Sequence, residues 1–81
     1  MTAAELQKFL IKKREQMNLT HQNVADLSKA GISRQYYGMI ESGERKPSVK
    51  VAKKIAQVLN VEWTIFFDTE SNQKLQSKTT A

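Results

Sequence analysis

The sequence predicts an all-α protein that folds as a compact bundle of five short helices. Apolar residues recur at helical spacing in several segments, and a serine or threonine stands before most of these segments, where an N-cap is expected. The alternating pattern of a half-buried strand does not occur in the sequence. A chain of 81 residues can build only a thin core, which favours short helices with local contacts.

The first predicted helix begins after Thr2 and ends at Asn18. Thr2 and Glu5 have the spacing of a capping box, in which each side chain accepts a hydrogen bond from the backbone amide of the other residue. Leu6, Leu10 and Met17 recur at helical spacing, with Phe9 beside them, and predict its buried face. Asn18 is a suitable end because asparagine tolerates the left-handed conformation that often follows a helix.

The second and third predicted helices are separated by Gly31, the strongest helix breaker inside the chain. Thr20 is placed to cap the second helix and Ser33 to cap the third, which covers Arg34 to Glu41. The apolar positions of these two helices are Val24, Ala25 and Leu27 in the second and Tyr37 and Ile40 in the third.

A polar loop from Ser42 to Pro47 leads to the fourth predicted helix, which Ser48 caps and Asn60 ends. One face of this helix is apolar and the other face carries lysines, which is typical of a helix that packs on a core. A fifth, very apolar helix is expected from Glu62 to Phe67. Its aromatic residues Trp63, Phe66 and Phe67 are expected in the core, whereas Ile65 is hard to bury with them on one short helix and is expected to be exposed.

Residues 1–67 are interpreted as one domain and residues 68–81 as a flexible polar tail, in which Leu75 is the one large apolar residue. The chain has no cysteine, which excludes disulfides, thiolate zinc sites and a cysteine nucleophile. With His21 as the single histidine, we expect no metal site, no cofactor and no enzymatic activity. The apolar runs are too short for a membrane span or a signal peptide, so we expect a cytoplasmic protein without membrane contact.

Basic residues outnumber acidic ones by 13 to 8, which gives a formal net charge of +5. One acid-free stretch from residue 45 to residue 54 holds much of this charge, in Arg45, Lys46, Lys50, Lys53 and Lys54. The balance suits a polyanionic partner, although the solvated face of a small protein can carry similar charge.

The two helices around Gly31 have the features of a helix-turn-helix unit. Helices that cross at a steep angle need a small residue where they touch, and Ala25 supplies it. The turn between them needs a residue that accepts positive φ, and Gly31 supplies it. The third helix then keeps one face free to enter a groove, and this face consists of Arg34, Gln35, Tyr36, Gly38 and Met39.

Five short motifs, taken in order, resemble the Cro/repressor-type (XRE-family) helix-turn-helix proteins. They are residues 19–25 (Leu-Thr-His-Gln-Asn-Val-Ala), 31–34 (Gly-Ile-Ser-Arg), 40–43 (Ile-Glu-Ser-Gly), 47–48 (Pro-Ser) and 54–61 (Lys-Ile-Ala-Gln-Val-Leu-Asn-Val). The resemblance covers about residues 5–67. It implies a phage-repressor-like fold that binds double-stranded DNA, as in phage repressors, Cro proteins, antitoxins and regulators of plasmids or mobile elements.

The chain departs from the family pattern at three places. Ala25 and Gly31 are six residues apart, where the family usually has four, so either the second helix is longer or its turn is looser. His21 stands where the family usually has glutamine. Lys13 stands where the first helix usually carries leucine, so we expect this site to be more exposed or filled by the lysine stem.

The resemblance implies that the third helix reads base edges in the major groove. Arg34 and Gln35 open this helix, and arginine pairs bidentately with guanine and glutamine with adenine. Tyr36 is expected to contact a phosphate or a thymine methyl group. Met39 either touches a thymine methyl group or covers the rim of the helix, and both interpretations remain open.

The predicted phosphate contacts lie at helix starts and in the loop after the third helix. They are His21, Gln22, Ser33, Arg45, Lys46, Ser48 and Lys50. For His21 the alternative is a neutral residue at a helix start without a DNA contact. Lys53 and Lys54 are interpreted as part of a solvated face.

The resemblance also implies a structural ion pair and a dimer. Arg14 and Glu41 match the family's pair that links the first helix to the end of the third. The implied function is a homodimeric repressor that binds an inverted-repeat operator, with Ile65 at the dimer surface. The alternative is an interaction module for a protein partner, such as an antitoxin or antirepressor. RNA binding is disfavoured because the sequence shows no aromatic stacking platform.

Overall fold

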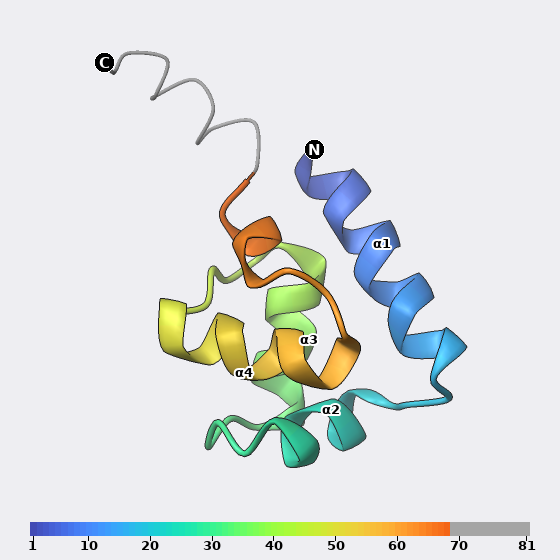
Figure 1. Ribbon diagram of the computed structural model, residues 1–81, viewed down its shortest axis with the longest axis vertical. Coiled ribbons are helices and arrows are strands. Elements are labelled where there is room, and N and C mark those ends of the chain that lie inside the picture. Colours follow the sequence, from blue (N-terminus) through green and yellow to red (C-terminus); the bar gives the residue numbers. More distant parts are fainter. Residues whose placement is uncertain (69–81) are drawn as a thin grey trace.

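A computed structural model describes residues 1–68 and shows four α-helices followed by one short 3₁₀ helix (Figure 1). The elements are α1 (Ala3–Gln16), α2 (His21–Ser28), α3 (Arg34–Ser42), α4 (Val49–Leu59) and η1 (Trp63–Phe66). No strand occurs among the described residues, so the all-α prediction is confirmed. The predicted count of five α-helices is not confirmed, because the segment expected to form the fifth helix forms only η1.

α1 runs along one side of the molecule, α2 lies across one end, and α3 and α4 fill the middle (Figure 1). η1 packs against α4. The amino group of Met1 donates a hydrogen bond to the carbonyl oxygen of Asp68 at 3.3 Å, so the two ends of the described chain meet. The predicted polar tail lies, apart from Asp68, outside the described residues.

Each α-helix begins at the side chain that the sequence predicts. The hydroxyl oxygens of the four caps accept hydrogen bonds from the backbone amide three residues later, and the caps are Thr2, Thr20, Ser33 and Ser48. The capping box of Thr2 and Glu5 is present in both directions. These bonds satisfy amides that the first helical turn leaves without a partner.

The turn between α2 and α3 contains the extra residues of this chain. α2 ends at Ser28, and the next residue, Lys29, is left-handed with φ 54°. Lys29 lies four residues after Ala25, which is where the family pattern has its glycine. The helix is therefore not lengthened, and the two additional residues lie in the turn, where Gly31 has φ 74°.

The hydroxyl of Ser28 stabilises the start of this longer turn. It donates to the carbonyl oxygen of Ala25 at 2.8 Å and accepts from the amide of Ala30 at 3.2 Å. The bonds replace backbone pairing that the end of a short helix lacks. They explain why Ser28, a polar residue, is buried.

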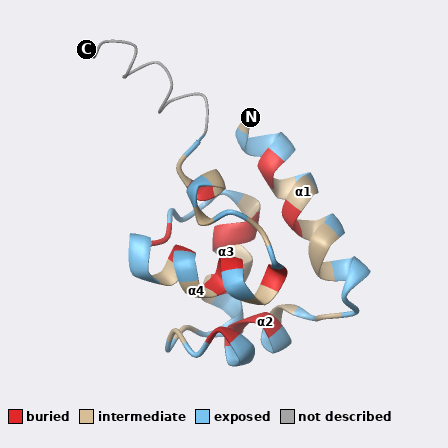
Figure 2. Cartoon of the chain, viewed as in Figure 1, coloured by how far each residue is buried: buried red, intermediate tan, exposed pale blue. Residues whose placement is uncertain are grey.

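The core lies between the inner faces of all five elements (Figure 2). Its fully buried large side chains are Tyr37, Leu10, Ile40, Ile55, Leu59 and Val24. Two residues predicted on apolar helix faces are exposed instead, Leu27 at 56% and Met17 at 43%. Met17 follows Gln16, the last residue of α1, and so lies outside the helix that was to bury it. Successive helical residues are about 100° apart, so Leu27 points away from Ala25, and the buried stripe of α2 continues through Ser28 instead.

The segment around η1, which follows α4, covers one side of the core. Phe66 is buried with 2% exposure, whereas Trp63, Ile65 and Phe67 are only partly buried. The rings of Trp63 and Phe67 meet edge to face, with centroids 6.0 Å apart. A four-residue 3₁₀ helix aims one aromatic ring inward and leaves the others at the rim, so the expectation of a fully buried aromatic group holds for Phe66 only.

Candidate nucleic-acid interface

A buried carboxylate at the end of α3 connects three helices. Glu41 accepts from Arg14 Nε at 2.9 Å and Nη2 at 3.2 Å, and from the hydroxyl of Tyr37 at 2.9 Å. The His21 Nε2 atom lies 3.0 Å from its second oxygen. We call these four residues the Glu41 cluster. The side chain of Glu41 is 5% exposed and that of Arg14 is 15% exposed, so the pair predicted from the family resemblance lies largely away from water.

The Glu41 cluster holds its carboxylate in the charged form. Burial alone would raise the pKa of Glu41, but the hydrogen bonds from Arg14, His21 and Tyr37 outweigh it, and the pKa lies below the usual glutamate range. The hydrogen bond to Glu41 raises the pKa of Arg14. Burial, reinforced by the neighbouring carboxylate, raises the pKa of Tyr37, which therefore stays protonated and donates. The charge arrangement fixes the end of α3 relative to α1 and α2.

Two members of the Glu41 cluster, Tyr37 and His21, were not predicted as partners of Glu41. Tyr37 and Glu41 are four residues apart on one helix, a spacing that brings side chains together and could have indicated their bond. His21 and Glu41 are 20 residues apart on different helices, and no local pattern indicates that they meet. Arg14 also donates to the carbonyl oxygen of Leu19 at 3.1 Å, which holds the connection between α1 and α2.

The first turn of α3 presents the residues predicted to read bases. Arg34 and Gln35 are exposed, Tyr36 and Met39 are partly buried, and Tyr37 points into the core. Met39 uses its carbonyl oxygen to accept amides from the loop that follows α3, at 2.9 and 3.2 Å. α3 thus buries one side and leaves the opposite side of its N-terminal half open to solvent.

An open groove lies between the start of α2 and the outer face of α3. Its lining residues are Arg14, Thr20, His21, Gln22, Arg34, Gln35 and Gly38. The groove brings two predicted base-reading residues, Arg34 and Gln35, next to two predicted phosphate ligands, His21 and Gln22. Gly38 was noted on the outer face of α3, and the structure shows that its missing side chain leaves room beside the His21 ring.

The phosphate ligands predicted near α2 and α3 already have partners within the protein. His21 is bonded to Glu41, and Gln22 donates from Nε2 to Asp26 at 2.9 Å. Ser33 uses its hydroxyl oxygen to accept from the amide of Tyr36 at 3.0 Å. A hydroxyl that accepts can still donate its own hydrogen, so this cap bond leaves Ser33 able to bind an anion.

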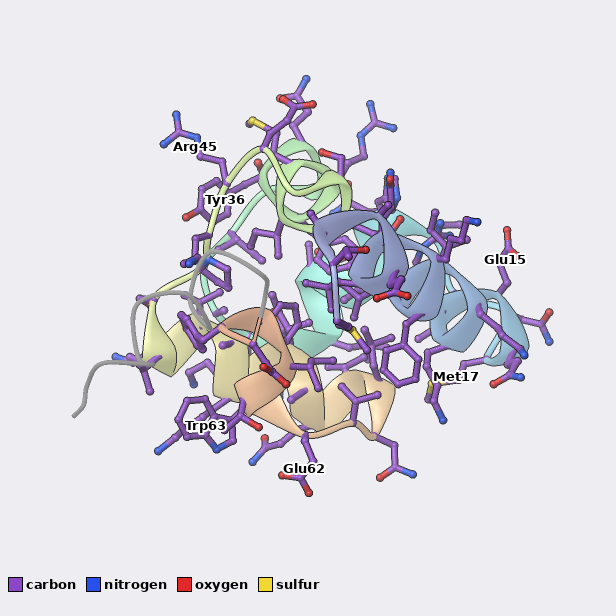
Figure 3. All side chains as sticks on the ribbon, turned by 90° about the horizontal axis from the view of Figure 1, so that it is seen from above. Glu15, Met17, Tyr36, Arg45, Glu62 and Trp63 are labelled. Atoms are coloured by element: carbon purple, nitrogen blue, oxygen red, sulfur yellow. The ribbon has the colours of Figure 1, made fainter. Side chains whose placement is uncertain are left out.

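The remaining predicted phosphate ligands lie apart from the groove, in the loop before α4 and in its first turn. Arg45, Lys46, Ser48 and Lys50 are all exposed. The hydroxyl oxygen of Ser48 accepts from the amide of Val51 at 3.2 Å. Figure 3 shows Arg45 on the same side of the molecule as Tyr36 of α3. The basic loop and the exposed face of α3 therefore border one surface.

The opposite side of the molecule carries the C-terminal aromatic residues. Figure 3 shows Trp63 and Glu62 on the side away from Tyr36 and Arg45. Lys53 lies over the ring of Trp63, with Nζ 5.0 Å from the centroid, and so belongs to this side.

Ile65, which was expected to be exposed, is partly buried in a shallow groove with Phe9, Lys13 and Val61. Lys13 is itself partly exposed. Its Nζ atom lies 5.8 Å from the ring centroid of Phe9, so the lysine stem covers the position where the family has leucine.

No helix between residues 1 and 68 has both the length and the hydropathy to cross a bilayer. The same residues contain no group of three histidine, aspartate or glutamate side chains that could hold a metal ion.

The chain is similar to known helix-turn-helix proteins over most of its length. The family described as Helix-turn-helix matches residues 10–66. An uncharacterised HTH-type transcriptional regulator of Bacillus subtilis strain 168, YqaF, is 47% identical over 77 residues, which are 94% of this chain and 99% of that protein. A second such regulator from the same organism, YqaE, is 41% identical over 66 residues, which are 82% of this chain and 55% of that protein. No solved structure matches the chain significantly. Because the family matches residues 10–66 and YqaF is 47% identical over 94% of this chain, the protein belongs to the XRE-type helix-turn-helix family.

Proposed function

We propose that the protein is a transcriptional regulator that binds a specific sequence of double-stranded DNA through α3. The observation that carries the proposal is the first turn of α3, where Arg34 and Gln35 are exposed while Glu41 ties the other end of the helix to α1 and α2. A recognition helix must be held rigidly because a base contact tolerates little change in position. The relatives named as transcriptional regulators support the same assignment.

Phosphate contacts on both sides of α3 would set its register in the major groove. We assign them to His21, Gln22 and Ser33 at the helix starts, and to the exposed basic loop before α4. That loop contributes Arg45, Lys46 and Ser48, and the first turn of α4 contributes Lys50. Tyr36 and Met39 complete the surface that faces the bases.

We further propose that the protein acts as a dimeric repressor, which occupies an inverted-repeat operator and so blocks a promoter. One short recognition helix covers few base pairs, and useful specificity needs two copies. In a two-fold dimer the half-site centres would lie about 10 bp apart, one turn of DNA. We assign the dimer surface to Ile65 and the neighbouring Trp63, since this side leaves the Tyr36 face uncovered.

Removal of single charges tests the assignment. Arg34→Ala is expected to relax base preference and to cost about 1–3 kcal/mol on the preferred sequence, as loss of a bidentate base contact does. Arg45→Ala is expected to weaken binding to all sequences alike and to reduce the salt slope by about one unit. Lys8→Ala removes the same charge from an exposed position of α1 that belongs to neither the proposed DNA surface nor the proposed dimer surface, and is expected to leave both properties unchanged.

Competition binding against a randomised duplex library, repeated at several salt concentrations, measures these effects. An unchanged preferred sequence in Arg34→Ala would contradict the assignment of the reading face. Failure to bind any duplex would contradict the proposal as a whole. The alternative, a module such as an antitoxin or antirepressor whose main partner is a protein, would then gain support if the partner's binding hardly responded to salt.

A further inference from the structure

The imidazole of His21 has its two nitrogen atoms in different environments. Nε2 lies 3.0 Å from a carboxylate oxygen of Glu41, and the side chain of Glu41 is only 5% exposed. Because the Glu41 cluster keeps this carboxylate ionised, the carboxylate can only accept a hydrogen bond. Nε2 must therefore carry a hydrogen in both the neutral and the charged form of the ring.

The second nitrogen, Nδ1, faces the groove between α2 and α3. A methyl group at Gly38 would lie 3.5 Å from Nδ1 and 3.7 Å from Cε1, so the glycine leaves space beside this edge of the ring. The side chain of His21 is 39% exposed and lines the groove together with Arg34 and Gln35. The edge of the ring that carries Nδ1 thus lies beside Gly38, a lining residue of the groove where DNA is proposed to bind.

The chemistry of Nδ1 depends on the charge of the ring. In the neutral ring, with hydrogen on Nε2, Nδ1 presents a lone pair, which repels a phosphate oxygen. In the imidazolium, Nδ1 carries a hydrogen and donates to that oxygen while Nε2 stays bonded to Glu41. Glutamine, which the family usually has at this position, could donate a hydrogen bond to Glu41, but the glutamine side chain cannot gain a proton and become charged.

We propose that His21 binds a DNA phosphate through Nδ1 as an imidazolium, so that each protomer takes up a proton when it binds DNA. This inference rests on the proposed function. The identity of the ligand follows from the groove, which presents cationic and amide side chains to an anion. The uptake of a proton makes the occupancy of the DNA depend directly on pH.

The charged and titratable groups around the ring act in both directions. Glu41 of α3 favours the imidazolium, whereas Arg14 of α1 and Arg34 of α3, which line the same groove, oppose it. Tyr37 of α3 packs edge to face on the ring at 5.6 Å and stays uncharged. The positive end of α2, where His21 is the first residue, also opposes the charge. A phosphate in the groove adds a negative charge and shifts this balance towards the protonated ring.

The sign of the pH effect follows from this linkage. DNA binds the protonated form, so affinity is highest at low pH and falls as the ring loses its proton. The decrease is at most about tenfold in affinity per pH unit for each protomer bound, because one proton is exchanged per protomer. Outside the range in which histidine titrates, the affinity becomes independent of pH.

Fluorescence anisotropy with a fluorescein-labelled duplex of mixed sequence measures the effect, since phosphate contacts do not require an operator. Affinity is determined at constant ionic strength from about pH 5.5 to about pH 8, where histidine changes its charge. The wild type is compared with His21→Gln, and circular dichroism establishes that both are folded at each pH. The two proteins share every other titratable group, so the difference between them isolates His21.

We expect the affinity of the wild type to fall with rising pH, and that of His21→Gln to stay nearly constant. Lys8→Ala, which removes an exposed charge of α1 outside both proposed surfaces, is expected to keep the wild-type slope. An equal slope in His21→Gln, or a wild type that binds DNA without a slope, would overturn the inference while leaving DNA binding intact. A protein that binds no duplex at any pH would overturn the proposed function as well.

Discussion

Glu41 is the residue whose replacement is expected to cost the most stability. Glu41→Ala removes the acceptor of two hydrogen bonds from Arg14 and of those from Tyr37 and His21. It leaves a guanidinium that is 15% exposed without its counter-charge, and a buried hydroxyl without its acceptor. Breaking a buried pair in this way costs about 3–5 kcal/mol. Small domains have about 5–15 kcal/mol in total, so the loss should amount to about a fifth of the free energy of unfolding at the least and to all of it at the most.

Urea unfolding followed by the fluorescence of Trp63, the single tryptophan, measures the loss. Glu44→Ala is the matched control, because Glu44 is exposed and accepts only a long bond from Ser42 at 3.3 Å. We expect the control to change stability by less than about 0.5 kcal/mol. Far-UV circular dichroism supplies a second measure of unfolding.

A double-mutant cycle separates the ion pair from other effects of the substitution. Arg14→Met keeps much of the side-chain volume and leaves Glu41 without its guanidinium. The free energy of unfolding lost in the double variant should be smaller than the sum of the two single losses by about 0.5–3 kcal/mol, the usual coupling of residues in direct contact. Full additivity, or equal losses in Glu41→Ala and Glu44→Ala, would refute the reasoning.

Three further predictions concern other parts of the structure. The fold lowers the pKa of Glu41, so the contribution of its carboxylate to stability is present above the ordinary glutamate pKa and is lost below about pH 4. Urea unfolding at neutral and at acidic pH should therefore show a larger decrease in the free energy of unfolding for the wild type than for Glu41→Gln. Gly38→Ala should raise stability by about 0.5–1 kcal/mol, since alanine favours the helix and its methyl group has no neighbour closer than 3.5 Å, yet weaken DNA binding in the anisotropy assay because the methyl group fills the space beside His21. Ile65→Glu should reduce dimer formation, measured by sedimentation, while circular dichroism still shows a folded protein; an unchanged dimer would contradict the proposed surface.

The starts of the α-helices could be predicted from the sequence alone. Thr2, Thr20, Ser33 and Ser48 each bond an amide three residues away, and such contacts depend only on the local order of residues. The all-α class followed from the same caps and from the helical spacing of apolar residues. The length of η1 could not be predicted in this way, because the conformation of a short apolar segment depends on the core that it covers.

The contacts that hold the candidate interface together arise from tertiary packing and could be seen only in the structure. Arg14 and His21 lie 27 and 20 residues before Glu41, and only the packing of α1 and α2 on α3 brings them to the carboxylate. The resemblance predicted the first of these partners, while no pattern predicted the second. The same packing placed the two additional residues in the turn rather than in α2, where the left-handed Lys29 ends the helix. Local hydrogen bonds can be predicted from neighbouring residues, whereas a buried charge finds its partners only when distant helices close around it.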